Sequence, residues 1–208
     1  MGVKTRATID GAMQTRTEPQ QQRSRDKRDR VLAAAAALLQ EMPFDEIGTR
    51  QIADRAGVSV GSLYRFFPDK DAIFSALSAT WLDKVLDLME AQLADPPPTV
   101  RELVDRLVEA FAEFFRAEPG YRQVSLGAQA LRIDPGAGAR NDEQLAERLF
   151  TVLTEHYGEP GGDARRRRLT LAVRLTEFML NQAFRADPAG DAWVLAELKT
   201  LLERYLSG

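Results

Sequence analysis

The sequence has no cysteine and only one histidine among its 208 residues. The absence of cysteine excludes disulfide bonds, thiolate nucleophiles and zinc sites built on cysteine. The single histidine, His156, has too few partners for a metal site, because isolated carboxylates around one imidazole do not complete a ligand set. No nucleophile motif accompanies it. We therefore expect no metal, no cofactor and no enzymatic activity.

Long hydrophobic runs are also missing. No stretch reaches the roughly 18 uncharged apolar residues that a membrane helix requires. The alanine-rich run at residues 31–39 is too short, and it lacks the cleavage pattern of a signal peptide. No segment alternates apolar and polar residues as a strand does. We expect a cytoplasmic chain with no membrane partner and an all-α fold.

Positive charge is unevenly distributed. The net charge is −3, but residues 1–70 carry 12 Lys and Arg against 9 Asp and Glu, whereas the remainder carries 16 against 22. Residues 1–24 are polar and aperiodic, which predicts a flexible basic N-terminal arm. This arm is either a solvated tail or a segment that reaches a DNA minor groove. The densest group of N-terminal cations is Arg23, Arg25, Lys27, Arg28 and Arg30.

The rest of the chain has helical periodicity. Apolar residues recur at spacings of three and four, and proline or glycine separates the periodic segments. The basic run at residues 165–168 is expected to be the solvated first turn of a helix, with an anion site as the alternative. About nine helices are predicted: one that ends at Pro43, then 49–57, 59–67, 69–94, 100–115, 121–131, 144–157, 164–186 and 191–206.

Residues 49–70 have the pattern of a helix-turn-helix, which is two short helices joined by a turn that contains glycine. We expect Thr49 and Ser59 to cap the two helices and Gly57 to adopt a positive φ between them. Leu63 is expected to pack inward. The outward set suits a major groove, where the second helix presents its N-terminal residues to base edges. That outward set is Ser59, Val60, Gly61, Ser62, Tyr64 and Arg65.

The same segment carries a dense set of characteristic residues. They are Thr49, Ile52, Ala53, Ala56, Gly57, Val58, Ser59, Gly61, Leu63, Tyr64, Phe67 and Lys70. From Arg28 to Leu77 the chain closely resembles the TetR family of transcriptional regulators. The resemblance implies an N-terminal three-helix DNA-binding domain, a helical C-terminal domain for ligand binding and dimerisation, and a homodimer on a palindromic operator of double-stranded DNA.

The resemblance also implies roles for individual residues. The base edges would meet residues 60–62, whereas Thr49 and Arg50 would lie near the DNA backbone. Tyr64 and Lys70 would hold phosphates, and Arg65 could touch either. Phe66 stands where relatives carry a polar residue, which argues against a base contact there. The predicted DNA-binding set is Thr49, Arg50, Ser59, Val60, Gly61, Ser62, Tyr64, Arg65 and Lys70.

Large side chains are frequent on the C-terminal helices. By themselves they indicate a packed core. The resemblance adds that such helices commonly enclose a ligand pocket, in which polar side chains orient the ligand among apolar walls. The predicted pocket residues are Trp81, Met89, Phe111, Phe115, Tyr121, Gln129, Phe178 and Gln182.

The last two predicted helices carry long apolar stripes, which must be buried against another helix. Packing within the chain is one solution. The resemblance implies the other, a four-helix bundle across the two-fold axis of a dimer. The predicted dimer residues are Thr176, Met179, Ala183, Val194, Leu198, Leu201, Leu202 and Tyr205.

These observations divide the chain into an arm at 1–24, a DNA-binding domain at 25–70 and a ligand-binding and dimerisation domain at 71–208. The predicted function is a repressor that leaves its operator when an unidentified small-molecule effector binds. The helix at 69–94 belongs to both domains and would be the lever between them. One alternative is a DNA-binding regulator without an inducer. The other is a helical enzyme or a small-molecule carrier.

Overall fold

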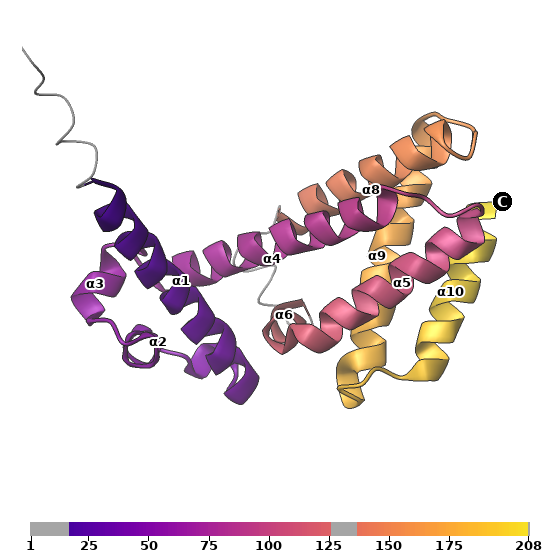
Figure 1. Cartoon of the computed structure of the whole chain (residues 1–208). Helices are drawn as coiled ribbons and strands as arrows, with labels where there is room; N and C mark the ends of the chain where they lie inside the picture. Colours follow the sequence, from indigo (N-terminus) through magenta and orange to yellow (C-terminus); the bar gives the residue numbers. More distant parts are fainter. Residues whose placement is uncertain (1–16, 126–136, 208) are drawn as a thin grey trace, which may run out of the picture.

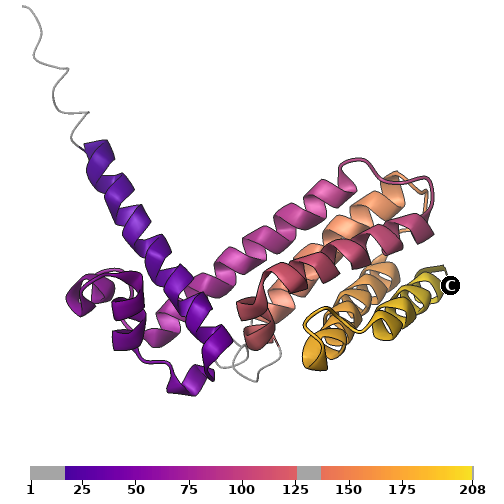
Figure 2. The same cartoon turned by 60° about the horizontal axis from the view of Figure 1, so that its bottom comes forward.

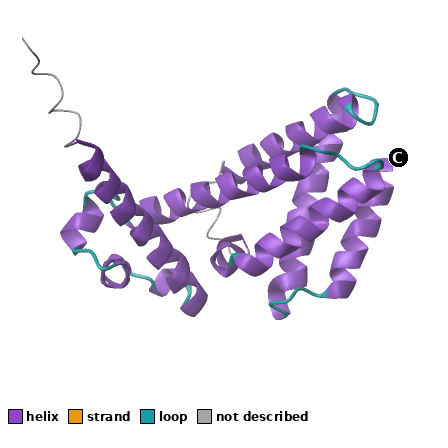
Figure 3. Cartoon of the chain, viewed as in Figure 1, coloured by secondary structure: helices purple, strands orange, loops and turns teal. Residues whose placement is uncertain are grey.

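The computed structural model describes residues 17–125 and 137–207, and this part of the chain is built from helices without a strand (Figures 1 and 3). The all-α prediction is confirmed. The helices are α1 (Thr17–Glu41), the short 3-10 helix η1 (Phe44–Glu46), α2 (Thr49–Ala56), α3 (Val60–Tyr64), α4 (Lys70–Leu93), α5 (Val100–Ala117), α6 (Pro119–Ser125), α8 (Ala137–Glu155), α9 (Asp163–Ala186) and α10 (Ala192–Ser207).

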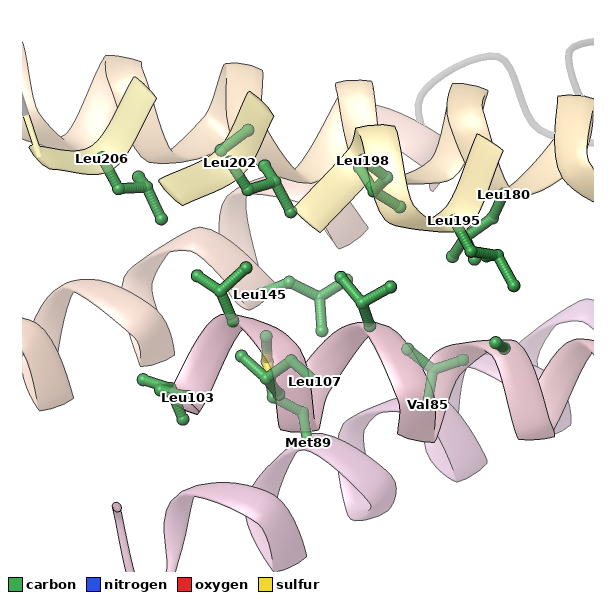
Figure 4. Close-up of a cluster of buried hydrophobic side chains, with 14 of the residues drawn as sticks. Val85, Met89, Leu103, Leu107, Leu145, Leu180, Leu195, Leu198, Leu202 and Leu206 are labelled. Carbon is green, nitrogen blue, oxygen red and sulfur yellow. The ribbon is translucent and has the colours of Figure 1, made fainter. Parts of the chain in front are cut away.

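Two hydrophobic cores share the long helix α4. The N-terminal core joins α1, α2 and α3 to the first half of α4 and ends at Trp81. The C-terminal core begins at Val85 and joins the second half of α4 to α5, α8, α9 and α10; Figure 4 shows its side chains. The predicted domain boundary at residue 70 therefore differs from the division between the cores, which falls within α4 between Trp81 and Val85.

Two helices begin earlier than the sequence pattern predicts. Helix α1 starts at Thr17, so residues 17–24, predicted as part of a flexible arm, are helical. Helix α8 starts at Ala137 rather than near 144. An ion pair between Arg174 Nε and Asp142 Oδ2, 2.8 Å apart, joins the start of α8 to α9. Apolar periodicity does not reveal a helical end that is held by a polar contact. The second half of the predicted 121–131 helix lies outside the described residues.

Helix α6 forms the corner between the two cores. Gly120 packs so closely that a methyl group there would lie 2.9 Å from the Ala36 carbonyl oxygen of α1 and 3.2 Å from the Trp81 ring. The Trp81 Nε1 donates to Glu118 Oε2 at 3.1 Å, and Lys84 forms an ion pair with the same carboxylate. These contacts set the position of α1, and hence of α2 and α3, relative to the C-terminal helices.

The basic run at residues 165–168 is not a uniformly solvated turn. The Nη1 of Arg165 donates to the Leu206 carbonyl at 2.8 Å, so this arginine caps the end of α10. Arg166 pairs with Glu147 of α8 at 2.9 Å, and Arg168 lies over a tyrosine ring. The prediction of a solvated turn holds for Arg166 and Arg167, which are exposed, and is wrong for Arg165, which is held against the end of α10.

Two negative findings apply to the described part of the chain. None of its helices combines the length and the apolar character that a membrane crossing needs. No group of three or more histidine, cysteine, aspartate or glutamate side chains there is placed to hold a metal ion.

Candidate nucleic-acid interface

The turn between α2 and α3 has the geometry that its glycine predicts. Gly57 lies in the left-handed region, with φ 62° and ψ 40°. Its N–H donates to the Asp54 carbonyl at 3.2 Å, and the N–H of Val58 donates to the Ala53 carbonyl at 3.0 Å. These bonds satisfy carbonyls at the end of α2 in a way that most side chains would strain. The predicted helix end and positive φ are confirmed.

Helix α3 begins at a side-chain cap. The Ser59 Oγ accepts from the Ser62 N–H at 3.1 Å, as predicted, and satisfies a donor that the first turn leaves unpaired. The inward side of this segment is anchored by Leu63, which is fully buried, and by Phe67 just beyond the helix. Because these two side chains fix the rotation of α3, the other side of the helix must face outward.

The outward face of α3 is exposed and uncharged at its centre. Val60 is 37% exposed and Tyr64 49% exposed, and Ser59, Gly61 and Arg65 also lie in solvent, whereas Ser62 is half-buried. A methyl group added to Gly61 would meet no atom of the other described elements within 4 Å. The chain's own packing therefore does not require glycine at this position. At Gly61, the surface of another molecule can therefore approach the backbone of α3 closely.

Thr49 does not cap α2, which corrects the prediction. The N-cap is Gly48, and the side-chain oxygen of Gln51 accepts from the Gly48 N–H at 2.6 Å. The Thr49 hydroxyl instead lies 3.1 Å from the Tyr64 hydroxyl. This contact brings the start of α2 and the end of α3 together, so two of the predicted DNA-binding residues form one polar cluster.

Arg50 and Lys70 lie in different surroundings. Arg50 is exposed on the first turn of α2, next to Thr49. Lys70 is half-buried at the start of α4, where its Nζ donates to the Phe44 carbonyl at 3.0 Å and lies 4.3 Å from the centre of the Phe44 ring. The lysine thus ties η1 to α4. A phosphate contact by Lys70 stays a prediction, and the sequence pattern did not indicate this second role.

An ion pair fixes α2 against the end of α1. Arg55 donates to both Glu41 carboxylate oxygens, at 2.6 and 2.7 Å. The hydrogen bond from Arg55 lowers the pKa of Glu41, and the same bond raises the pKa of Arg55. Both side chains are largely exposed, so the pair orients the helices more than it stabilises them.

The structure separates the predicted pocket residues into three groups. Met89 and Phe115 are buried in the C-terminal core, with Phe111 and Tyr121 partly buried against it. Trp81 belongs to the N-terminal core. Gln129 lies outside the described residues. The predictions for Phe178 and Gln182 are wrong, because both side chains are exposed on the outward face of α9.

The predicted dimer residues lie mostly on the inward side of α9 and α10. Ala183, Leu198 and Leu202 are buried in the chain's own core, so their assignment to a dimer interface is wrong. The Thr176 hydroxyl donates to the Ala172 carbonyl of its own helix at 2.8 Å. The other four, Met179, Val194, Leu201 and Tyr205, are half-buried. Instead, the exposed large apolar side chains of these helices are Leu171, Phe178 and Trp193.

Comparison with known proteins agrees with this architecture. Residues 31–77 match the family of bacterial regulatory proteins named tetR, and residues 98–208 match the tetracyclin repressor-like C-terminal domain. The chain is 29% identical over 132 residues to the nucleoid occlusion factor SlmA of Shewanella sp. (strain MR-4). That match spans 62% of this chain and only 61% of the curated relative.

Solved structures give matches over most of the chain. A TetR-family transcriptional regulator from Streptomyces coelicolor superimposes with a TM-score of 0.68 and 30% identity, covering 88% of this chain and 97% of that one. The regulator FadR from Bacillus subtilis, in complex with stearoyl-CoA, has a TM-score of 0.69 at 16% identity over 86% and 97% of the two chains, and shows the fold alone. The two family matches and the Streptomyces structure establish that the chain belongs to the TetR family of bacterial regulatory proteins.

Proposed function

We propose that this chain binds double-stranded DNA through α3 as a transcriptional regulator. The observation that carries the proposal is the exposed surface around Gly61, where neither packing nor hydrogen bonding within the described chain accounts for the absence of a side chain. A helix backbone without a side chain at this point can approach base edges closely. The core-facing side of the same helix is rigidly held by Leu63.

Each exposed residue has a chemistry that suits part of a duplex. The methyl groups of Val60 can contact the methyl group of thymine, and the Ser62 hydroxyl can donate to or accept from base edges. Tyr64 and Thr49, joined through their hydroxyls, lie at the rim of this face and would donate to phosphates together with Arg50. Arg65 would contact either a base or a phosphate.

A second copy of the chain would complete the DNA-binding unit. Two recognition helices on successive turns of a major groove must lie about 34–36 Å apart, which requires a two-fold dimer. The outward face of α9 and the start of α10 support this, because Leu171, Phe178 and Trp193 are exposed there, Phe178 to 60% and Trp193 to 71%. Apolar side chains of this size on adjacent helices favour an isologous interface.

Repression relieved by an effector is the finer part of the proposal. The description of the C-terminal family as repressor-like supports repression, and the stearoyl-CoA complex of FadR is a precedent for a small-molecule ligand in this fold. Helix α4 belongs to both cores, so a ligand that favours one tilt of α4 would change the spacing of the two α3 helices. A coupling free energy of about 1–3 kcal/mol would change operator affinity roughly 5–150-fold.

In vitro selection of duplexes by the purified chain tests the DNA-binding proposal. We expect a palindromic site with half-sites one helical turn apart. Chromatography with light scattering tests the interface. Phe178→Glu should convert dimer to monomer, whereas Ala79→Glu, at an exposed position of α4, should leave the dimer intact. A monomeric wild type that binds no duplex in dilute salt would overturn the proposal.

Thermal unfolding in the presence of a metabolite library separates the inducer model from its alternative. A compound that raises the unfolding temperature and also releases the selected duplex supports effector-controlled repression. If compounds stabilise the protein without changing its affinity for DNA, the regulator works without an inducer of that kind.

A further inference from the structure

The first part of α1 contributes no residue to the two hydrophobic cores of the described chain. Residues 17–30 precede Val31, the first residue of the N-terminal core. At 1.5 Å per residue this segment is about 20 Å long. Figures 1 and 2 show it extending beyond α2 and α3. From Gln21 to Arg30 every side chain is exposed except Ser24, which is half-buried.

Three cations of this segment share one side of the helix. Arg23, Lys27 and Arg30 are spaced four and three residues apart, so they fall within an arc of about 60°. We call them the basic stripe. Arg25 points to the opposite side of the helix. In the part of the chain that the structure describes, no carboxylate lies within ion-pair distance of the stripe. The nearby Asp26 instead accepts from Gln22 Nε2 at 2.9 Å.

Two contacts fix how α1 is rotated about its own axis. The Arg28 guanidinium lies 5.6 Å from the centre of the Phe67 ring, which directs that side of α1 toward the N-terminal core. Arg30 reaches the turn between α2 and α3, where a methyl group on Gly57 would lie 3.6 Å from its Nη1. The basic stripe therefore starts at the turn that precedes α3 and continues outward along α1.

We infer that the basic stripe is a second DNA contact surface, which binds the phosphates that flank the half-site occupied by α3. This inference rests on the proposed DNA binding by α3. Unpaired arginine and lysine side chains attract a phosphate backbone irrespective of base sequence. The rise from Arg23 to Arg30 is about 10 Å, which corresponds to about three base-pair steps. The stripe would strengthen binding to every sequence and would not choose among them.

The test uses a duplex selected by the purified chain, in two lengths. The short duplex ends at the palindrome, and the long duplex carries about ten further base pairs on each side. The variant Arg23→Gln/Lys27→Gln/Arg30→Gln removes the stripe. The matched control is Arg25→Gln, compared with the single variant Lys27→Gln, because the two differ in helix face and not in charge. Dissociation constants are measured from about 50 to 300 mM salt.

On the long duplex we expect the triple variant to bind at least tenfold more weakly than the wild type at about 150 mM salt. Each lost phosphate contact makes the negative slope of log K against log salt shallower by about 0.9. For a dimer that loses six contacts, the magnitude of this slope should fall by about 5. On the short duplex the two proteins should differ by less than twofold. Lys27→Gln should weaken binding to the long duplex, and Arg25→Gln should not.

Three outcomes would overturn the inference. If the triple variant matches the wild type on the long duplex, the stripe does not contact DNA, although binding by α3 stands. If Arg25→Gln and Lys27→Gln weaken binding equally, the effect is one of overall charge and not of a defined face. If the wild type binds neither duplex, the proposed function fails as well. Circular dichroism confirms the fold of each variant, because the substituted positions precede the core.

Discussion

The helix-turn-helix and the pair α9–α10 both expose apolar side chains, but their sequences predict this to different degrees. In α3, a cap at Ser59 and a buried Leu63 leave only one possible outward face. In α9, apolar residues occupy both the buried side, as at Leu180, and the exposed side, as at Phe178. Short helices with defined ends therefore reveal their orientation, whereas long helices that are apolar on two sides do not.

Truncating a buried aromatic residue of the C-terminal core should have the largest effect. Phe115 is buried, and its ring centre lies 5.4 Å from those of Tyr121 and Phe184. We expect Phe115→Ala to lower the free energy of unfolding by about 3–5 kcal/mol, because the surrounding helices cannot fill the cavity. Urea unfolding followed by circular dichroism measures this. A loss below about 1 kcal/mol would mean that this core adapts more readily than its burial indicates.

A smaller loss is expected at the corner between the two regions. Gly120→Ala would place a methyl group 2.9 Å from the Ala36 carbonyl oxygen, so α1 and α6 must separate. We expect a cost of about 1–3 kcal/mol, measured by thermal unfolding. If the two halves are coupled through α6, the affinity for the selected duplex should also change. An unchanged unfolding temperature would contradict the close packing at this corner.

Gly61→Ala makes the same substitution as Gly120→Ala, but on the exposed face of α3. Since no atom of the other described elements lies within 4 Å of the added methyl group, stability should be unchanged or rise by about 0.5–1 kcal/mol. Affinity for the selected duplex should fall at least tenfold, because the methyl group would separate α3 from the base edges. Titration of labelled duplex measures the affinity, with the wild type as the comparison. Unchanged affinity would remove Gly61 from the DNA-binding surface.

The smallest effects concern one ion pair in each region. Hydrogen bonds from Arg55 and Arg166 lower the pKa of Glu41 and Glu147, respectively. A carboxyl whose pKa is lowered by folding stabilises the protein above its unfolded pKa of about 4.3, and this contribution is lost as the pH falls through the folded value. Glu41→Gln and Glu147→Gln should therefore lower the unfolding temperature slightly at pH 7.

That difference from the wild type should shrink as the pH falls below about 4.3, and it should vanish once the wild-type carboxyls are protonated in the folded protein. Thermal scans at a series of pH values from 7 downward check this for the two variants in parallel. If either variant is as stable as the wild type at pH 7, its ion pair orients two helices without stabilising them.

Local chemistry made much of the DNA-binding surface predictable. The αL conformation of Gly57 and the cap at Ser59 depend on residues within a few positions, and both are confirmed. The cap at Thr49 was predicted on the same grounds and is wrong, because Gln51 caps the Gly48 N–H and the Thr49 hydroxyl pairs with Tyr64 of α3. When a hydroxyl has two possible hydrogen-bond partners, its neighbours in sequence do not show which partner it takes.

The sequence by itself determined the helical class, the turn at Gly57 and the inward position of Leu63, since each depends on spacing or on the conformational freedom of one residue. Only the tertiary structure decided that Leu198 and Leu202 face the chain's own core, that Phe178 faces solvent and that Arg30 reaches the turn before α3. Periodicity shows that a helix has an apolar side. Which neighbour covers that side depends on how helices far apart in the sequence pack together.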